Sequence, residues 1–156
     1  GGTLSALACL RLRDDPAAPE LQVLAYANTD LAARLPSMVD KGQGGFGLEE
    51  KTVRFFARTW QPDETRLADP DVSPLRAASL AGLPAAIVVC AEHDPLRDEG
   101  LAYARRLHRD GVPVVTRTEA GLVHNFLLLD EMSPACARAG DRLAADVRTF
   151  FSEPGG

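Results

Sequence analysis

The sequence lacks a cluster of lysine or arginine residues: its basic residues are scattered, and the formal net charge of the 156-residue chain is −5. Proteins that bind nucleic acids or anionic membranes usually gather basic residues on one face. The sequence also lacks an apolar stretch of about 18 residues, the length that a membrane-spanning helix needs. We therefore expect neither a nucleic-acid partner nor a membrane span.

Cysteine and histidine patterns typical of metal sites are also missing. Cys9, Cys90 and Cys136 lie far apart in apolar surroundings, which predicts buried free thiols in a reducing, cytoplasmic compartment. The stretch GQGGFG at 42–47 has the glycine spacing of a dinucleotide-binding loop, but it follows no predicted strand and indicates a flexible loop. No metal or organic cofactor is expected.

What the sequence does contain is an alternation of apolar strands and helices. Continuous apolar runs at 21–27, 84–91 and 112–118 are typical of parallel strands buried on both faces. Helical patterns occupy 3–13, 97–111 and 134–151, with Asp98 expected to cap the second of them and Gly111 to end it. This order predicts an α/β fold with a mostly parallel sheet and right-handed crossovers.

The segment 31–76 interrupts that alternation. It contains two helical patterns, at 30–39 and 48–60, and the second places aromatic side chains on one face. A lid over a pocket and ordinary core packing both account for them, and the sequence does not separate the two. We divide the chain into an α/β core, 1–30 and 77–156, and a helical lid-like excursion, 31–76.

The predicted core is thin. Three strands leave one sheet edge without a neighbour, and the helix at 3–13 is apolar on nearly every side, so it needs cover all round. We therefore expect the sequence to be the C-terminal half of a larger domain, with further chain preceding Gly1.

An acid and an imidazole follow two successive predicted strands. Asp94 comes just after the run at 84–91, where Pro95 favours extended backbone, and His124 follows the next strand, 30 residues later. If these strands are neighbours, about 4.8 Å apart, both side chains emerge at the carboxyl edge of the sheet, where α/β proteins bind ligands. A carboxylate on one imidazole nitrogen would make the other a general base.

The alternative interpretation is that Asp94 caps a turn and His124 is an incidental loop residue. The other two histidines are weaker candidates for a functional role. His108 falls on a predicted solvent-exposed helix face beside arginines, and His93 is notable only as the sequence neighbour of Asp94. A serine nucleophile is not evident, because no G-x-S-x-G pattern occurs and Ser79 precedes a strand instead of following one.

Three short motifs resemble a known family. DPLRDEG, at 94–100, is followed by GLVHNF, at 121–126, and YANTDL, at 26–31, precedes both. Together with the segment from 69 to 93, these stretches are similar to the C-terminal half of α/β-hydrolases in the hormone-sensitive-lipase-like carboxylesterase group. The resemblance covers essentially the whole chain.

The resemblance implies a serine hydrolase triad in the chain order Ser, Asp, His. Asp94 would be the triad acid and His124 the triad base. The opening GGTLSALAC resembles the two glycines after the nucleophile of the family's G-D-S-A-G-G elbow, so the serine would lie two residues before Gly1. The oxyanion hole would come from the residue just before Gly1 and from an upstream HGGG-type loop.

The sequence departs from the family pattern beside the base. Asn125 stands where the family usually has glycine, and Ala27 where proline is common. The larger Asn125 would narrow the pocket or touch the substrate. The expected substrate-binding residues are otherwise aromatic: Phe126, Phe46, Phe55, Phe56 and Trp60.

The sequence thus predicts a serine carboxylesterase acting on small esters. The same triad would also serve an acyltransferase, lactonase or cyclase, and a non-catalytic relative would bind a small molecule under the lid. The implied partners are a small-molecule ester, the preceding segment of the same hydrolase and, in a dimeric assembly, a second copy of the chain.

Overall fold

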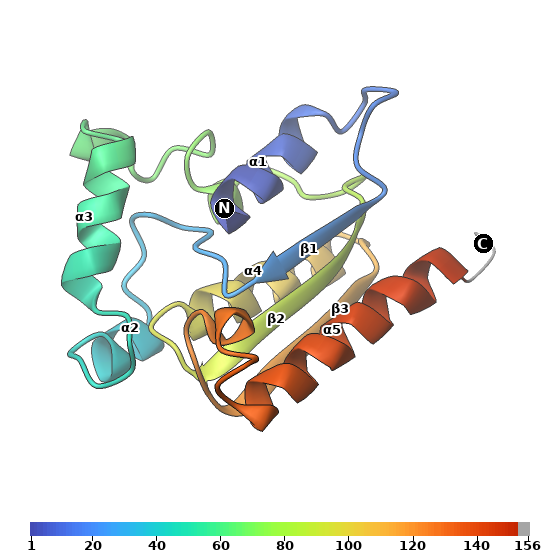
Figure 1. Cartoon of the computed structure of the whole chain (residues 1–156). Coiled ribbons are helices and arrows are strands. Elements are labelled where there is room, and N and C mark those ends of the chain that lie inside the picture. Colours follow the sequence, from blue (N-terminus) through green and yellow to red (C-terminus); the bar gives the residue numbers. More distant parts are fainter. Residues whose placement is uncertain (153–156) are drawn as a thin grey trace.

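The computed structural model describes residues 1–152, which form a parallel three-stranded sheet covered by helices (Figure 1). The main helices are α1 (Gly2–Arg11), α2 (Pro36–Lys41), α3 (Glu50–Trp60), α4 (Arg97–Arg109) and α5 (Pro134–Ser152). The strands are β1 (Leu21–Ala25), β2 (Ala85–His93) and β3 (Val114–Val123), and short 3₁₀ turns occupy Glu64–Arg66, Pro74–Arg76 and Phe126–Leu128. The predicted α/β class is confirmed.

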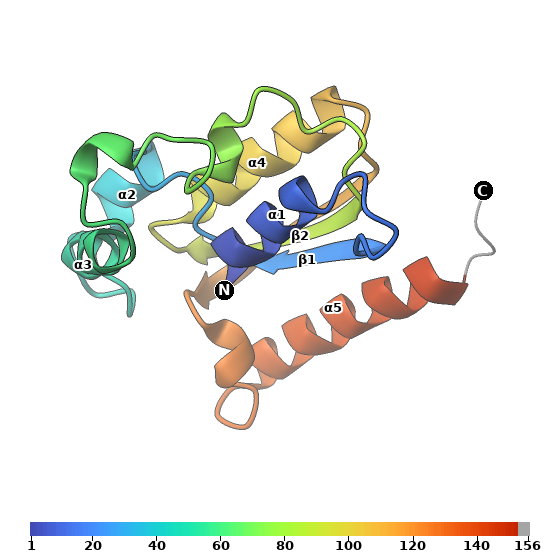
Figure 2. The same ribbon diagram turned by 90° about the horizontal axis from the view of Figure 1, so that it is seen from above.

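The sheet order is β1–β2–β3, and both pairings are parallel. Central β2 is apolar along most of its length because both of its faces are covered. Ala86, Val88 and Cys90 face the core formed with α1 and α4, and Ile87 and Val89 face the core that includes α5. Figure 2 shows α1 and α4 on one side of the sheet and α5 on the other.

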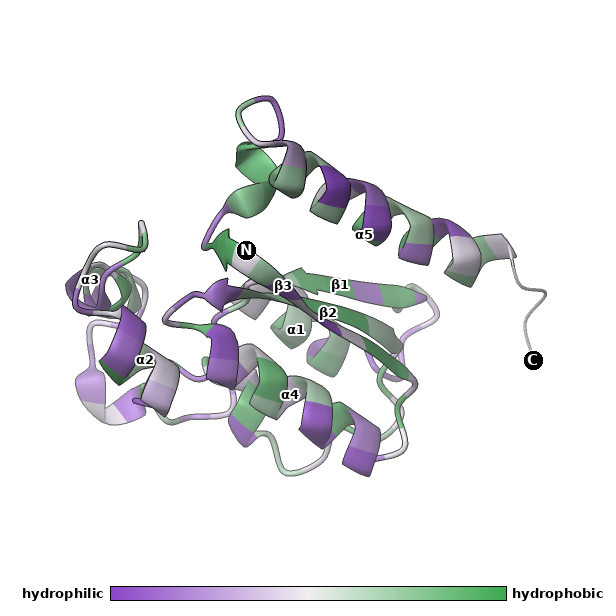
Figure 3. Cartoon of the chain, turned by 90° about the horizontal axis from the view of Figure 1, so that it is seen from below, coloured by the Kyte–Doolittle hydropathy of each residue, from purple (hydrophilic) through white to green (hydrophobic). Residues whose placement is uncertain are grey.

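Apolar side chains on the helices follow this layering. In α5, Cys136 and Ala139 are buried, and Leu143 and Val147 pack against the same core, so one apolar face of the helix covers the sheet. Figure 3 shows apolar residues gathered between the sheet and the helices. Among residues 1–152, none of the helices combines the length and the apolarity that crossing a lipid bilayer demands.

The largest differences from the sequence-based element boundaries occur at α2 and β3. The helix predicted at 30–39 begins only at Pro36, because a residue before proline is excluded from helical backbone and Leu35 is extended, with φ −76° and ψ 166°. The strand predicted at 112–118 continues to Val123, because its partner β2 also runs on past an irregularity between Ala91 and His93. His124 therefore follows β3 directly.

The predicted cap of α4 is wrong. The N-cap position is Leu96, and Asp98 lies in the first turn, where its carboxylate accepts the Ser37 amide of α2 at 2.9 Å. The Asp98 amide in turn donates to the Ser37 hydroxyl at 3.1 Å. Asp98 thus ties two helices together. At the other end, Gly111 has a φ of +83° just beyond the helix, as a helix-ending glycine requires.

The segment 31–76, with α2 and α3, lies beyond the carboxyl ends of the strands (Figures 1 and 2). Its helix α3 begins at Glu50, within the predicted 48–60. Of the side chains on α3, all of which are described, Ala57 is the one that is buried. The position at the strand ends is where a cover over a ligand site would be found, and the division into core and lid stays a prediction.

We expect Gly2→Ala to destabilise the protein, although alanine normally favours helices. A Cβ at Gly2 would lie 2.4 Å from Cβ and 2.9 Å from Cα of Ala27, so α1 must move away from the end of β1. Overpacking of this kind costs about 1–3 kcal/mol. Urea unfolding of the complete protein measures the loss, with Gly140→Ala in α5 as the control, because a Cβ at Gly140 meets only Leu127 Cδ2, at an ordinary contact distance of 3.8 Å. A Gly2→Ala protein as stable as wild type would contradict this.

Candidate active site

The turn after β2 presents a buried carboxylate. Asp94 is 0% exposed, and its Oδ1 accepts the amide of Leu96 at 2.8 Å. Its backbone carbonyl also accepts the amide of Arg97, where α4 begins, at 3.1 Å. One oxygen of Asp94 is therefore engaged by its own turn, which directs the other, Oδ2, toward the neighbouring strand end.

That second oxygen meets His124. The Nδ1 of His124 lies 2.9 Å from Asp94 Oδ2, and no serine among residues 1–152 forms a hydrogen bond with the imidazole. The pairing of β2 with β3 produces the contact, since His93 of β2 is opposite Val123, the residue before His124. With Nδ1 held by the acid, Nε2 is the nitrogen free to accept a proton from a third group.

The segment after β1 packs against the same imidazole. The ring centroid of Tyr26 lies 4.9 Å from that of His124 and 5.4 Å from that of Phe126, which it meets edge to face. Burial, and secondarily the charge of Asp94, raises the pKa of the Tyr26 phenol. Tyr26 was not among the residues predicted for the site, because its contacts depend on which strand lies beside β2.

Two non-glycine residues in the described part of the chain have positive φ, Tyr26 at 41° and Asn125 at 64°. Both touch or adjoin His124. Such backbone is costly for most side chains and concentrates at functional sites. It also explains the family's glycine at position 125: the turn after His124 needs left-handed backbone, which asparagine tolerates better than most residues.

The start of α1 lies at this same edge of the sheet (Figures 1 and 2). The Thr3 hydroxyl donates to the Asn28 carbonyl at 2.6 Å, and Gly2 sits against Ala27. Residues 26–28 therefore contact His124 on one side and the first turn of α1 on the other.

The residues predicted to bind substrate are not brought together. Phe126 is 0% exposed and packs in the core with α5, and Asn125 is exposed. Phe46 stacks on His93 with centroids 5.2 Å apart. Phe55, Phe56 and Trp60 are 64%, 62% and 42% exposed on α3. A hollow of about 400 Å³ runs along α3, lined by Lys51, Arg54, Phe55, Arg58 and Thr59, and it does not reach His124.

The remaining titratable candidates are inert or solvated. His108 is exposed on α4, as predicted. Cys9, Cys90 and Cys136 are buried free thiols, as predicted, and burial raises the pKa of Cys90 to about 12. Within residues 1–152, no group of three or more histidine, cysteine or acidic residues is arranged to hold a metal ion.

Comparison with known proteins places this geometry in a family. Residues 1–128 match the family described as having the alpha/beta hydrolase fold. The chain belongs to the α/β-hydrolase family. Within it, the group is that of the hormone-sensitive-lipase-like esterases, because the relatives that match most of this hydrolase chain are named as ester hydrolases.

Three of these relatives show the extent of the match. Carboxylic ester hydrolase LipN of Mycobacterium tuberculosis is 37% identical over 97% of this chain and 42% of its own length. The arylesterase of Saccharolobus solfataricus is 40% identical over 81% of this chain and 42% of its own. The thermophilic carboxylesterase EstE1, from a metagenomic library, superposes with a TM-score of 0.89 at 34% identity, covering 96% of this chain and 51% of EstE1.

The chain thus spans about half the length of the relatives it matches. The half that it spans contains the acid–imidazole pair and the first turn of α1.

Glu99 is a buried acid in the first turn of α4 that was not among the residues predicted for the site. It is 3% exposed, and its Oε1 accepts the backbone amides of Thr29 and Asp30, the latter at 2.7 Å. Burial, partly offset by these two amides and reinforced by the charges of Asp30 and Asp94, raises the pKa of Glu99 from 4.5 to about 8.

This shift predicts a pH-dependent stability. Between pH 4.5 and 8 the unfolded state releases the Glu99 proton while the folded state keeps it, so this residue's contribution to stability falls as the pH rises through that range. The neutral Glu99→Gln variant escapes this loss. The free energy of unfolding of Glu99→Gln minus that of wild type should therefore be larger at pH 9 than at pH 5. The expected increase is a few kcal/mol, because one pKa unit corresponds to about 1.4 kcal/mol.

Urea unfolding of both proteins at pH 5 and pH 9 measures the gain. The control is Glu50→Gln, because hydrogen bonds from Arg34 and Arg54 lower the pKa of Glu50 to about 2, so that its titration lies below this range. An unchanged stability difference between wild type and Glu99→Gln at the two pH values would refute the prediction.

Proposed function

We propose that this hydrolase is a serine carboxylic ester hydrolase that acts on small esters through a Ser–His–Asp triad. The observation that supports it best is the 2.9 Å contact between His124 Nδ1 and the fully buried Asp94 carboxylate at the carboxyl edge of the parallel sheet. An acid on Nδ1 fixes the imidazole tautomer in which Nε2 is the base. The ester hydrolase names of the relatives support the same chemistry.

The nucleophile in this proposal is a serine that precedes Gly1. Because the first turn of α1 contacts Ala27 and Asn28, and Tyr26 contacts His124, a residue just before Gly1 would lie on the imidazole side of the sheet edge. The helix start would also favour an oxyanion, since its free amides point that way. The amide before Gly1 and an upstream glycine-rich loop would complete the oxyanion hole.

The reaction would proceed in two halves. The serine oxygen attacks the ester carbonyl while His124 Nε2 takes its proton, and the same proton passes to the departing alkoxide as the acyl-enzyme forms. Water then repeats the sequence and releases the acid. Asp94 would hold the imidazole in place and stabilise its cation.

The segment 31–76 would cover this site. Its position beyond the strand ends suits a lid, and the exposed rings of Phe55, Phe56 and Trp60 would line the acyl or alcohol pocket together with Phe46. Asn125, exposed next to the base, would limit the size of the group that fits there.

The test is an assay of the complete protein, including the residues before Gly1, on p-nitrophenyl esters of two to eight carbons. We expect hydrolysis that is fastest on the shorter chains and is abolished by a serine-directed phosphonate. Turnover of thioesters or acyl-carrier substrates without ester hydrolysis would replace the proposal with acyl transfer. No turnover, and no phosphonate labelling, would make the protein a small-molecule binder.

A further inference from the structure

We propose that Glu99 is a positioning residue for the Asp94–His124 pair, acting through residues 26–30 of the segment after β1. The inference rests on the proposed function, because the activity that Glu99 supports is that of the triad. Glu99 contacts neither Asp94 nor His124 through a hydrogen bond. Its effect must therefore pass through the backbone that it holds.

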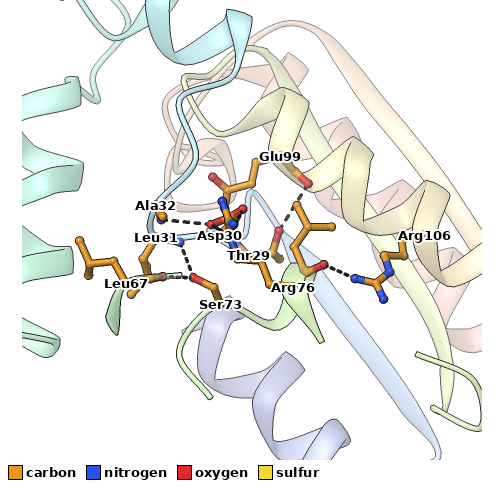
Figure 4. A network of polar contacts seen from close by, with 10 residues as sticks. Thr29, Asp30, Leu31, Ala32, Leu67, Ser73, Arg76, Glu99 and Arg106 are labelled. Carbon is orange, nitrogen blue, oxygen red and sulfur yellow. Dashed lines mark hydrogen bonds and ion pairs between the residues drawn. The ribbon is translucent and has the colours of Figure 1, made fainter. Parts of the chain in front are cut away.

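Glu99 stands in the first turn of α4, five residues after Asp94. Figure 4 shows its side chain crossing from α4 to the segment after β1, where one carboxylate oxygen accepts two successive amides, those of Thr29 and Asp30. The Thr29 hydroxyl returns a long bond of 3.4 Å to the Glu99 carbonyl. The helix that follows the acid is thereby joined directly to the segment after β1.

The held segment is fixed from its far side as well. Asp30 pairs with Arg76 at 2.8 Å through both of its oxygens, and the amide of Leu31 donates to the Ser73 hydroxyl at 2.8 Å. Glu99 provides the attachment toward α4, and the other bonds provide the attachment toward residues 73–76. Loss of Glu99 would release only the side that faces the acid.

The beginning of the segment contacts both the imidazole and the start of α1. Tyr26 packs its ring on His124 at 4.9 Å, with its backbone in the left-handed region. Ala27 and Asn28 contact Gly2 and Thr3 at the start of α1. A displacement at residues 29–30 would therefore shift the imidazole and the helix that follows the proposed nucleophile.

A carboxyl oxygen suits this position because a single oxygen can accept hydrogen bonds from both buried amides. An apolar side chain would leave both unpaired, which costs more than the bonds themselves contribute. Glutamine keeps a carbonyl oxygen at the same distance and should keep the geometry. Aspartate, shorter by one methylene, should not reach both amides.

The matched control is Asp110 at the opposite end of α4. Its carboxylate likewise accepts a backbone amide from a distant loop, that of Leu80, at 2.7 Å. Asp110 lies just past the end of α4, 16 residues along the chain from Asp94. Asp110→Leu therefore removes a comparable anchor without touching the segment 26–30.

The experiment compares Glu99→Leu, Glu99→Asp, Glu99→Gln and Asp110→Leu in the complete protein. We expect Glu99→Leu and Glu99→Asp to lower kcat by about 10- to 100-fold with a smaller change in KM, since a misplacement near 1 Å has this effect. Glu99→Gln and Asp110→Leu should keep kcat within about threefold of wild type. Proton NMR of the hydrogen between His124 Nδ1 and Asp94 should show its low-field resonance shifted or broadened only in the first two variants.

Folded Glu99→Leu and Glu99→Asp proteins with the kcat and the resonance of Asp110→Leu would overturn the inference. So would a Glu99→Gln variant as impaired as Glu99→Leu. If Glu99→Leu does not fold, Glu99→Asp carries the comparison. If wild type hydrolyses no ester, the proposed function fails, while the NMR comparison still decides whether Glu99 positions the pair.

Discussion

Replacing His124 with alanine is expected to lower kcat for a short p-nitrophenyl ester at least 10³-fold, because in the proposed mechanism the imidazole is the base that takes the serine proton. Among residues 1–152, His124 is the histidine that contacts the buried Asp94. KM should change little, since the imidazole acts mainly in the transition state. Steady-state kinetics of the complete protein, with folding checked by circular dichroism, provide the measurement.

His108→Ala is the matched control for this variant. His108 is exposed on α4, so its loss should leave kcat within about twofold of wild type, as for most exposed surface changes. A His124→Ala protein that hydrolyses esters as fast as the control would remove His124 from the mechanism.

Replacing Asp94 with asparagine is expected to lower kcat by about 10³- to 10⁴-fold with the fold preserved. The asparagine carbonyl can keep the bond from the Leu96 amide, which Asp94 Oδ1 accepts at 2.8 Å. Its NH₂ group would then face His124 Nδ1 in place of a carboxylate oxygen. The imidazole would have to accept a hydrogen bond at Nδ1 and carry its proton on Nε2, so it could no longer act as the base.

Asp98→Asn is the control for this second substitution. Asp98 lies four residues away and binds the Ser37 amide, outside the acid–imidazole contact. It tests whether loss of any carboxylate in this turn is enough to impair the enzyme. Equal kcat values for Asp94→Asn and Asp98→Asn would show that Asp94 does not orient the base.

The two variants probe the part of the site that local patterns predicted. Asp94 and His124 could be paired from the sequence because each comes shortly after a predicted strand, and one predicted helix separates the two strands. Parallel strands joined by one helix place their carboxyl ends at a common edge. That inference needs only the order of elements, and the 2.9 Å contact agrees with it.

The substrate-binding predictions were of a different kind. Phe126 and Phe55 are both aromatic residues near the predicted site, yet one is fully buried in the core and the other is 64% exposed on α3. Sequence alone cannot separate them, because burial depends on which distant elements pack over a residue. The position of Tyr26 against the imidazole was missed for the same reason.

By itself, the sequence determined the α/β class, the order of strands and helices, and the placement of Asp94 and His124 near successive strand ends, since these follow from hydrophobic runs and short spacings along the chain. The tertiary structure decided how far β3 extends, which aromatic rings are buried, and that Glu99 holds the amides of Thr29 and Asp30. These features arise from contacts between residues as many as 70 positions apart. Such contacts form only when the sheet brings together segments that leave no local pattern in the sequence.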